Sequence, residues 1–357
     1  MIIEDLLKEL KDLGGSDLHI SSMLPPVARV DGKLQRLDHP VLSSEDVENL
    51  LFPMMSNEQR RHLEQEWELD FSYGVKNVGR FRVNFYKDKG SYAAAFRTIA
   101  TTAPQLEELG MPPIITTVAE KPRGLVLVTG PTGSGKSTTL AAMIDYINRT
   151  RPEHILTIED PVEFVHTSKV SIIHQRELGM DTRSFANALK SALREDPDII
   201  LVGEMRDHET ISLALTAAET GHLVFGTLHT SSASQTIDRI IDVFPEGQQQ
   251  QIRVQLANSL VAVFSQTLLP KRQPDGSKKG RVMAQEILVK TNAISNMIRE
   301  GKTAQIYSGI QTGAGVGMQT LEAALANLYK QRLITEEDAM SKSQRPDEFK
   351  RLAGIAN

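Results

Sequence analysis

The stretch that decides the fold is Gly130-Pro-Thr-Gly-Ser-Gly-Lys-Ser137, which fits the phosphate-binding P-loop pattern G-x-x-x-x-G-K-[S/T] at every position. The run before it, Gly124 to Thr129, is apolar and β-branched and predicts a buried strand. The residues after it, Thr138 to Ile147, place apolar side chains on one side and predict a helix. A strand, a glycine-rich loop and a helix in this order are the context that the motif requires, so the sequence predicts a nucleotide site here.

This loop offers three kinds of group to a nucleotide phosphate tail. Its glycines allow successive backbone N–H groups to surround the β- and γ-phosphates, and the N-terminus of the following helix adds positive potential. Lys136 brings a positive charge to the β/γ oxygens, and the Ser137 hydroxyl is expected to ligate Mg²⁺. We therefore expect ATP and Mg²⁺ as cofactors. The loop residues expected to bind the phosphates are Gly130, Thr132, Gly133, Ser134, Gly135, Lys136, Ser137 and Thr138.

Composition excludes several classes of function. The 357 residues include 40 Lys plus Arg and 45 Asp plus Glu, so the net charge of −5 argues against wholesale nucleic-acid binding, although a local basic patch stays open. The chain has no cysteine, which excludes disulfides, Cys-ligated zinc and thiol catalysis. We expect a cytoplasmic protein without membrane insertion, because we find neither a signal-peptide pattern nor a run of about 18 apolar residues.

The pattern along the chain predicts two domains. Residues 1–100 predict a small α+β domain, and residues 101–113, rich in Pro and Thr, predict a linker. Residues 114–357 alternate strands and helices, which predicts an α/β domain with a parallel sheet, and about 290–357 is mostly helical. Four glycines within Gly309 to Gly317 predict a flexible hinge before a last helical pair.

Acidic residues follow two of the predicted strands. Glu204 ends an apolar strand, where we expect it beside the P-loop strand, able to hold Mg²⁺ through water or to orient the attacking water. The alternative is an ion pair with Arg206. Glu159, Asp160 and Glu163 end or follow another strand. Clustered carboxylates repel one another unless a cation lies among them, so we expect these acids to hold Mg²⁺. The alternative is an acidic turn exposed to solvent. The expected metal ligands are Ser137, Glu159, Glu163 and Glu204, and Glu163 and Glu204 are also candidate catalytic residues.

Two histidines flank the strand predicted at Leu223 to Leu228. His229 follows its carboxyl end, where ligands bind in open α/β sheets, and we expect it to hydrogen-bond the γ-phosphate. His222 lies at the opposite end, where a contact to a neighbouring subunit or a structural role are both open.

Three arginines are candidates for neutralising phosphate charge from the N-terminal domain. Arg80 and Arg82 alternate with Phe81 on a predicted strand and so share one face, and Arg97 lies on the next strand. They could act within the chain or on a neighbouring subunit; an exposed basic face is the alternative.

Four motifs in order resemble those of the secretion ATPase superfamily. The P-loop GPTGSGKST resembles its Walker A motif, and TIEDPVEF (Thr157 to Phe164) resembles its Asp box. ALREDPDIILVGEMRD (Ala192 to Asp207) resembles the Walker B motif, and TGHLVFGTLHT (Thr220 to Thr230) the His box. Met297-Ile-Arg-Glu-Gly-Lys302 resembles the AIREGK motif of the PilT-like branch, the type IV pilus retraction ATPases, with methionine in place of alanine. The resemblance covers essentially the whole chain.

The resemblance implies a cytoplasmic homohexamer in which each chain has a PAS-like N-terminal domain and a RecA-like ATPase domain. Nucleotide sits between the domains, and Arg80, Arg82 and Arg97 match the family's N-terminal arginines. Glu204 matches the Walker B glutamate, and Glu163 lies in the Asp box. The implied partners are a PilC-like platform protein, at the inner face of the inner membrane at the pilus base, and a PilU-like paralogue.

Two other functions stay open. One is a nucleotide-gated accessory ring with little turnover, against which the intact Glu204 weighs. The other is a motor for type II secretion or DNA transfer, against which the Met297 to Lys302 segment weighs. The pilus extension ATPases usually carry a long N-terminal region and a Cys-ligated zinc, and the absence of cysteine here favours retraction.

Overall fold

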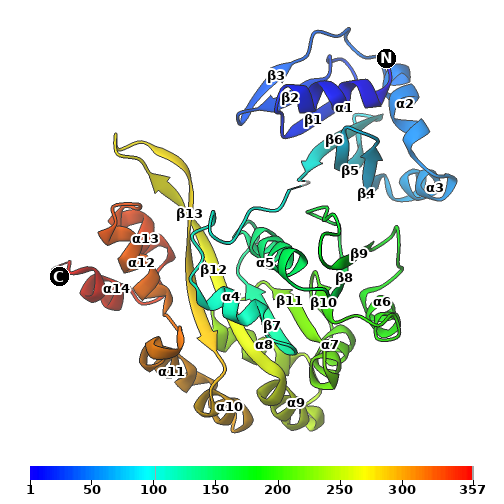
Figure 1. The fold of residues 1–357 in the computed structure, drawn as a ribbon. Helices are drawn as coiled ribbons and strands as arrows, with labels where there is room; N and C mark the ends of the chain where they lie inside the picture. The colour runs from blue at the N-terminus through cyan, green and yellow to red at the C-terminus, as the bar shows by residue number, and fades with distance from the viewer. Residues whose placement is uncertain (101, 356–357) are drawn as a thin grey trace. The chain divides into compact units, whose positions relative to one another are not determined.

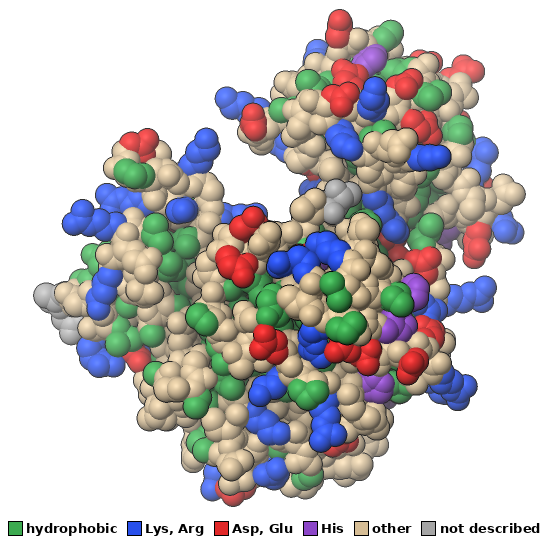
Figure 2. All heavy atoms as spheres, viewed as in Figure 1, with side chains coloured by type: hydrophobic (Ala, Val, Ile, Leu, Met, Phe, Trp, Pro, Cys, Tyr) green, Lys and Arg blue, Asp and Glu red, His purple; other side chains and the backbone are tan. Residues whose placement is uncertain are grey.

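The structure is a computed structural model that describes residues 1–100 and 102–355. The chain divides into two compact units (Figure 1). The N-terminal unit comprises Met1–Thr102 together with two short later segments, Pro161–His166 and Gly179–Asp181. The rest of the chain forms the second unit, which contains the P-loop and is called the ATPase unit below. On the face drawn in Figure 2, acidic and basic side chains are interspersed over both units.

The N-terminal unit is a six-stranded antiparallel sheet in the order β3-β2-β1-β6-β5-β4. One face of the sheet buries a cluster that includes Phe81, Phe85 and Phe96, against which the leucines of the first helix pack. The elements are α1 (Ile3–Asp12), β1 (Asp17–Ser21), β2 (Val27–Val30), β3 (Lys33–Arg36), α2 (Ser44–Leu51), η1 (Phe52–Met54), α3 (Asn57–Glu66), β4 (Glu68–Val75), β5 (Gly79–Asp88) and β6 (Ser91–Ile99).

The ATPase unit is built on a seven-stranded sheet in the order β13-β12-β7-β11-β10-β8-β9. All neighbouring strands are parallel except β12 and β13, which form a long antiparallel hairpin. Its elements before the C-terminal helices are α4 (Ile114–Ala119), β7 (Gly124–Thr129), α5 (Lys136–Thr150), β8 (His154–Glu159), β9 (Ile172–Glu177), α6 (Phe185–Ala192), β10 (Ile199–Val202), α7 (His208–Thr220), β11 (Leu223–Leu228), α8 (Ala233–Asp242), α9 (Glu246–Ser259), β12 (Leu260–Arg272) and β13 (Lys278–Val289).

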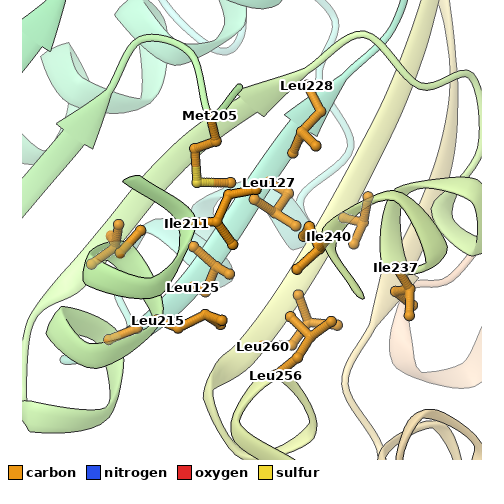
Figure 3. Close-up of a cluster of buried hydrophobic side chains, with 14 of the residues drawn as sticks. Leu125, Leu127, Met205, Ile211, Leu215, Leu228, Ile237, Ile240, Leu256 and Leu260 are labelled. Carbon is orange, nitrogen blue, oxygen red and sulfur yellow. The ribbon is translucent and has the colours of Figure 1, made fainter. Parts of the chain in front are cut away.

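The strand before the P-loop, β7, is buried at all six of its positions. Leu125 and Leu127 face one hydrophobic cluster, shown in Figure 3 with Leu256 and Leu260 beside them. Val126 and Val128 face a second cluster, on the side of the sheet covered by α4 and α5. A strand covered on both faces has no solvent side, which explains why this run is continuously apolar and does not alternate. The predicted α/β fold with a parallel sheet, a smaller N-terminal α+β part and C-terminal helices is confirmed.

The C-terminal region is helical, and its glycines serve packing. The segment from Gly309 to Gly317, where we expected a flexible hinge, forms the end of α11 (Ile306–Thr312) and the short turn η3 (Ala314–Val316). A Cβ on Gly313 would lie 2.6 Å from the Met318 sulfur, so this glycine permits close contact. The other elements are α10 (Asn292–Arg299), η2 (Thr303–Gln305), α12 (Leu321–Lys330), α13 (Glu336–Lys342) and α14 (Pro346–Ala353). No helix within residues 1–100 or 102–355 is both long and apolar enough to cross a membrane.

A buried carboxyl group joins β13 to α8. Glu286 on β13 is 4% exposed and accepts a hydrogen bond of 2.7 Å from the Ala233 backbone N–H, at the first turn of α8. Burial raises the pKa of the Glu286 carboxyl from 4.5 to about 7, and the nearby Glu322 acts in the same direction, while the Ala233 amide and Arg345 oppose the shift. Between these two pKa values the folded chain holds a proton that the unfolded chain has released, so stability is lost as pH rises through this window.

This linkage predicts the effect of Glu286→Gln on stability. The amide cannot ionise, yet its oxygen can still accept from the Ala233 N–H, so the variant avoids the cost of a buried charge. We expect it to be more stable than the wild type by about 3 kcal/mol at pH 8, with the difference shrinking to about 1 kcal/mol at pH 5. Urea unfolding at both pH values measures this, with Glu107→Gln, an exposed position of the same unit, as control. An equal effect at both pH values would contradict the assignment.

Candidate nucleotide-binding and catalytic site

The carboxyl edge of the parallel sheet brings four predicted elements together. Neighbouring strands β7, β11, β10 and β8 lead at this edge into the P-loop, His229, Glu204 and the Glu159–Asp160 turn respectively. The expectation that the strand before Glu204 lies directly beside β7 is wrong, because β11 lies between them and pairs in parallel with both. His229, which directly follows this intervening strand, therefore lies between the P-loop and Glu204 in the strand order.

The geometry of the P-loop explains its glycines. Gly130 has φ of 144°, and a Cβ there would lie 2.3 Å from the Gln266 carbonyl oxygen and 2.5 Å from the Ser134 hydroxyl. Gly135 is the N-cap of α5 with φ of 89°, in the left-handed region that favours glycine. A Cβ at Gly130 would push the loop away from β12, and a side chain at Gly135 would strain the backbone at the start of α5. Thr132 and Gly133 are exposed on the outer side of the loop.

Lys136 and the two hydroxyl groups after it occupy the first turn of α5. The Lys136 Nζ donates to the Gly130 carbonyl at 2.9 Å and to the Pro131 carbonyl at 3.3 Å, so it lies over the loop. Ser137 and Thr138 are half-buried, and among the described residues their hydroxyls make no hydrogen bond to another side chain or to the backbone. The chemistry of this set, an ammonium and hydroxyls at a helix N-terminus, suits phosphate and a hard cation.

A buried glutamine that the sequence analysis missed holds the loop from behind. Gln266 on β12 is 3% exposed; its Nε2 donates to the Ser134 carbonyl at 2.9 Å, and its Oε1 accepts from the Thr139 hydroxyl at 3.0 Å. Gln285 on β13 donates to the same Oε1 at 3.2 Å. The side chain thus ties the loop and the first turn of α5 to the sheet. No local motif marks Gln266, because only the pairing of β12 with β7 brings it to the P-loop.

Glu204 is held by two basic side chains. Its Oε2 accepts from the Arg206 guanidinium at 2.6 Å, and its Oε1 lies 3.0 Å from Nε2 of His229. The Arg206 hydrogen bond holds the pKa of the Glu204 carboxyl below its usual value; partial burial opposes this shift and His229 adds to it. Glu204 is therefore a carboxylate at neutral pH, able to accept a proton or a hydrogen bond from water.

The acids of the Asp-box segment are divided between the two units. Glu159 ends β8, and its Oε1 accepts from the Thr157 hydroxyl at 2.6 Å and from the Gln175 amide at 3.2 Å. Glu163 lies in the segment Pro161–His166 that belongs to the N-terminal unit. The described residues contain no group of three or more His, Asp or Glu side chains placed to hold a metal ion. Mg²⁺ in nucleotide sites needs only one or two protein ligands besides phosphate, so the half-buried Ser137 hydroxyl and the Glu204 carboxylate fit this ion.

The three candidate arginines share one face of the N-terminal sheet. Arg82 on β5 lies directly opposite Arg97 on β6, whereas Phe81 points into the core. Each has a partner: Arg80 donates to the Ser72 hydroxyl at 2.6 Å, Arg82 lies 3.7 Å from Asp70, and Arg97 lies 2.9 Å from Asp17. Arg97 is 73% exposed at its side chain, so a phosphate could replace its carboxylate partner at modest cost.

His222 has a local structural role at the opposite edge of the sheet. Its Nδ1 lies 2.9 Å from the Ala217 carbonyl in the last turn of α7, and its own carbonyl accepts from the Gly124 N–H at 3.0 Å. The first contact satisfies a carbonyl in the last turn of α7, and the second pairs the start of β7 with the residue before β11.

Comparison with known proteins assigns the chain to a family. The model of the family described as type II/IV secretion system protein matches residues 2–311, so the chain belongs to this family. The chain is 54% identical over 349 residues to PilT, the type IV pilus retraction ATPase of Pseudomonas aeruginosa. The aligned residues cover 98% of this chain and 100% of that protein. It is 57% identical over 319 residues to a twitching motility protein of Neisseria gonorrhoeae, covering 89% and 84% of the two chains.

The structure resembles a solved member of the same family. A crystal structure of the pilus retraction motor PilT with bound ADP superposes with a TM-score of 0.90 and 51% identity, over 98% of this chain and 99% of that one. The fold and sequence therefore place the chain among the secretion ATPases, close to the retraction motors.

The contacts of Gln266 predict that it positions the P-loop. Gln266→Leu leaves the Ser134 carbonyl and the Thr139 hydroxyl buried without this partner, and each such loss costs about 1–3 kcal/mol. We expect the affinity for Mg-ADP to fall by at least roughly tenfold. Titration calorimetry measures this, with Gln251→Leu on the exposed side of α9 as the matched control. Unchanged affinity in a folded Gln266→Leu variant would show that the loop holds its shape without the clamp.

Proposed function

We propose that this chain is an ATP-hydrolysing motor that powers the retraction of type IV pili. The observation that carries the proposal is the alignment of the P-loop, His229 and Glu204 at one sheet edge, in a chain that matches PilT of Pseudomonas aeruginosa from end to end. Phosphoryl transfer needs positioned donors and charge neutralisation more than covalent help, and this edge supplies both.

In the proposed mechanism, the backbone amides of residues 130–138 and the ammonium of Lys136 bind the β- and γ-phosphates. The hydroxyl of Ser137 and the carboxylate of Glu204 would hold Mg²⁺, directly or through water, and this ion would offset phosphate charge. Glu204 also orients the attacking water, because it is ionised and keeps acceptor lone pairs beyond its bonds to Arg206 and His229. The His229 ring lies within hydrogen-bond distance of Glu204. We propose that it also contacts the γ-phosphate, so that the presence of this phosphate changes the position of the Glu204 carboxylate. The proposed role of Glu159 and Glu163 is to add acidic groups for Mg²⁺, directly or through water.

The proposed role of Arg80, Arg82 and Arg97 is to neutralise phosphate charge from the N-terminal unit, within one chain or across a subunit boundary. Their partners support this proposal, since carboxylate and hydroxyl groups keep the guanidinium forks on one face of the sheet until phosphate replaces them. We infer a homohexamer, in which arginines supplied across a boundary make turnover depend on ring geometry and so couple chemistry to motion.

The proposed surface for the membrane platform is the end of α10. Gly301 follows this helix with φ of 68°, and the Lys302 N–H donates to the Met297 carbonyl, a Schellman-type helix end. This turn presents the exposed pair Glu300 and Lys302, whose charged groups lie 2.6 Å apart. We propose that the ring acts through this surface on a PilC-like platform protein at the cytoplasmic face of the inner membrane, beside a PilU-like paralogue.

The discriminating experiment compares phosphate release with retraction in Glu204 variants. Glu204→Gln removes the charge with little change in shape, and we expect the steady-state ATPase rate to fall at least about a hundredfold. Cells that carry this variant in place of their own retraction ATPase should lose twitching. Glu209→Gln, an exposed change at the start of α7, is the matched control and should keep both activities.

The outcomes separate the three candidate functions. Near-zero rates in both the wild type and Glu204→Gln would contradict the motor and favour a nucleotide-gated accessory ring. A wild-type rate that depends on Glu204 but does not restore twitching would favour a motor for type II secretion or DNA transfer.

A further inference from the structure

A pocket lies at the amino-terminal edge of the same sheet, away from the P-loop. It has a volume of about 720 Å³ and is lined by the start of β7, the junction of α9 with β12, and the end of β13. Gly124 lines this pocket, whereas the P-loop follows Thr129 at the other end of β7, roughly 20 Å away at the usual rise of a strand. In Figure 1 the start of β12 and the end of β13, which line the pocket, lie at the end of the sheet nearest α9 and α10.

The pocket is rich in positive charge. Lys121, Arg123 and Lys290 line it, against a single acid, Glu219, which accepts a hydrogen bond of 3.2 Å from Gln255. Within the described parts of the chain, Lys121 and Arg123 make no side-chain hydrogen bond and no ion pair. A chain with more acids than bases thus leaves two cations without carboxylate partners at one concave site.

Lys290 adds a third cation whose positive charge is not balanced by an acid. Its ammonium donates to the Asn258 carbonyl at the end of α9, and no carboxylate in the described chain forms an ion pair with it. Partial burial lowers the pKa of Lys290, and the positive charge of Arg299 adds to this effect. An anion in the pocket would offset the positive charge of Lys290 and favour its protonated form.

The rest of the lining gives the pocket an apolar wall and holds β7 close to the start of β12. Val118, Val261 and Val289 supply aliphatic surface beside the cations. A Cβ on Gly124 would lie 2.4 Å from a Val261 methyl carbon and 2.8 Å from the Ser259 carbonyl, so only glycine allows β7 to approach the start of β12 this closely. Pockets of about 300–1,000 Å³ with an apolar wall and a few converging polar groups are typical of sites for small organic ligands.

We propose that this pocket binds a small organic anion, with an apolar or aromatic body on the valine wall and a phosphate or carboxylate group neutralised by Lys121, Arg123 and Lys290. The volume suits one ligand of nucleotide size. The planar Arg123 guanidinium suits a bidentate contact with either anionic group. The lining residues are separate from the P-loop residues, so a ligand here would not compete with nucleotide for the same groups.

Titration calorimetry of the full chain, saturated with Mg-ADP so that the P-loop is filled, tests this inference with 1-naphthyl phosphate as probe. We expect a dissociation constant on the order of 0.1–1 mM. Inorganic phosphate, which lacks the apolar body, and 1-naphthol, which lacks the charge, should each bind at least roughly tenfold more weakly. 1-Naphthoate separates the two anion chemistries: binding as tight as that of the phosphate ester would identify carboxylates as ligands too, and weaker binding would restrict the site to phosphates.

Variants locate the binding. The double variant Lys121→Gln with Arg123→Gln changes two exposed side chains without partners, so it should fold normally and bind the probe roughly tenfold or more weakly. Lys271→Gln, an exposed change near the hairpin tip, is the matched control and should leave affinity unchanged. No binding up to 10 mM of probe (about ten times the weakest expected constant), or equal affinity in the double variant, would overturn the inference.

Discussion

The candidate nucleotide site depends on one constraint, the attachment of a glycine-rich loop to a strand that is buried on both faces. All six residues of β7 are buried, and the loop begins at the next residue. Backbone amides bind phosphate well only when their directions are fixed before the ligand arrives. The packing of Leu125 and Leu127 on one side and of Val126 and Val128 on the other therefore fixes the position of the groups that we propose bind phosphate.

Polar contacts behind the loop connect it to the other elements of the site. The buried hydroxyl of Thr129, at the end of β7, lies 2.8 Å from the Ser265 hydroxyl on β12. Thr236 of α8 lies 3.5 Å from Thr129 and 2.7 Å from Thr230, the residue after His229. Together with the Gln266 clamp, these contacts give the P-loop and the His229 segment common supports. A shift of either segment would disturb the other, which is the behaviour that a site coupled to motion requires.

The features predicted correctly from sequence are those that local chemistry decides. The apolar run from Gly124 to Thr129 forms β7, and the residues predicted to be helical after the P-loop lie in α5. The helix α3 was not predicted, because only Leu63 of its ten residues is buried and the usual apolar periodicity is absent. The edge strand β9 (Ile172–Glu177) is largely polar and was missed for a similar reason.

The site was predicted as a set of residues but not as an arrangement. The P-loop, Glu204 and His229 are recognisable because each follows an apolar strand, whereas the order of those strands in the sheet is a property of tertiary pairing. For the same reason the sequence placed Glu204 one strand too close to the P-loop and gave no sign of Gln266. The direct contact between Glu204 and His229 also follows from strand order and not from any spacing in the chain.

The central claim is that main-chain amides around Lys136 bind a triphosphate together with Mg²⁺. The most direct measurement is calorimetric titration of the full chain with a non-hydrolysable ATP analogue, with and without Mg²⁺, for the wild type and Lys136→Ala. The account predicts binding by the wild type that depends on Mg²⁺, weakened at least about a hundredfold in the variant, since a buried charge-assisted contact to phosphate is lost. Binding that ignores Mg²⁺, or equal affinity in the two proteins, would contradict it.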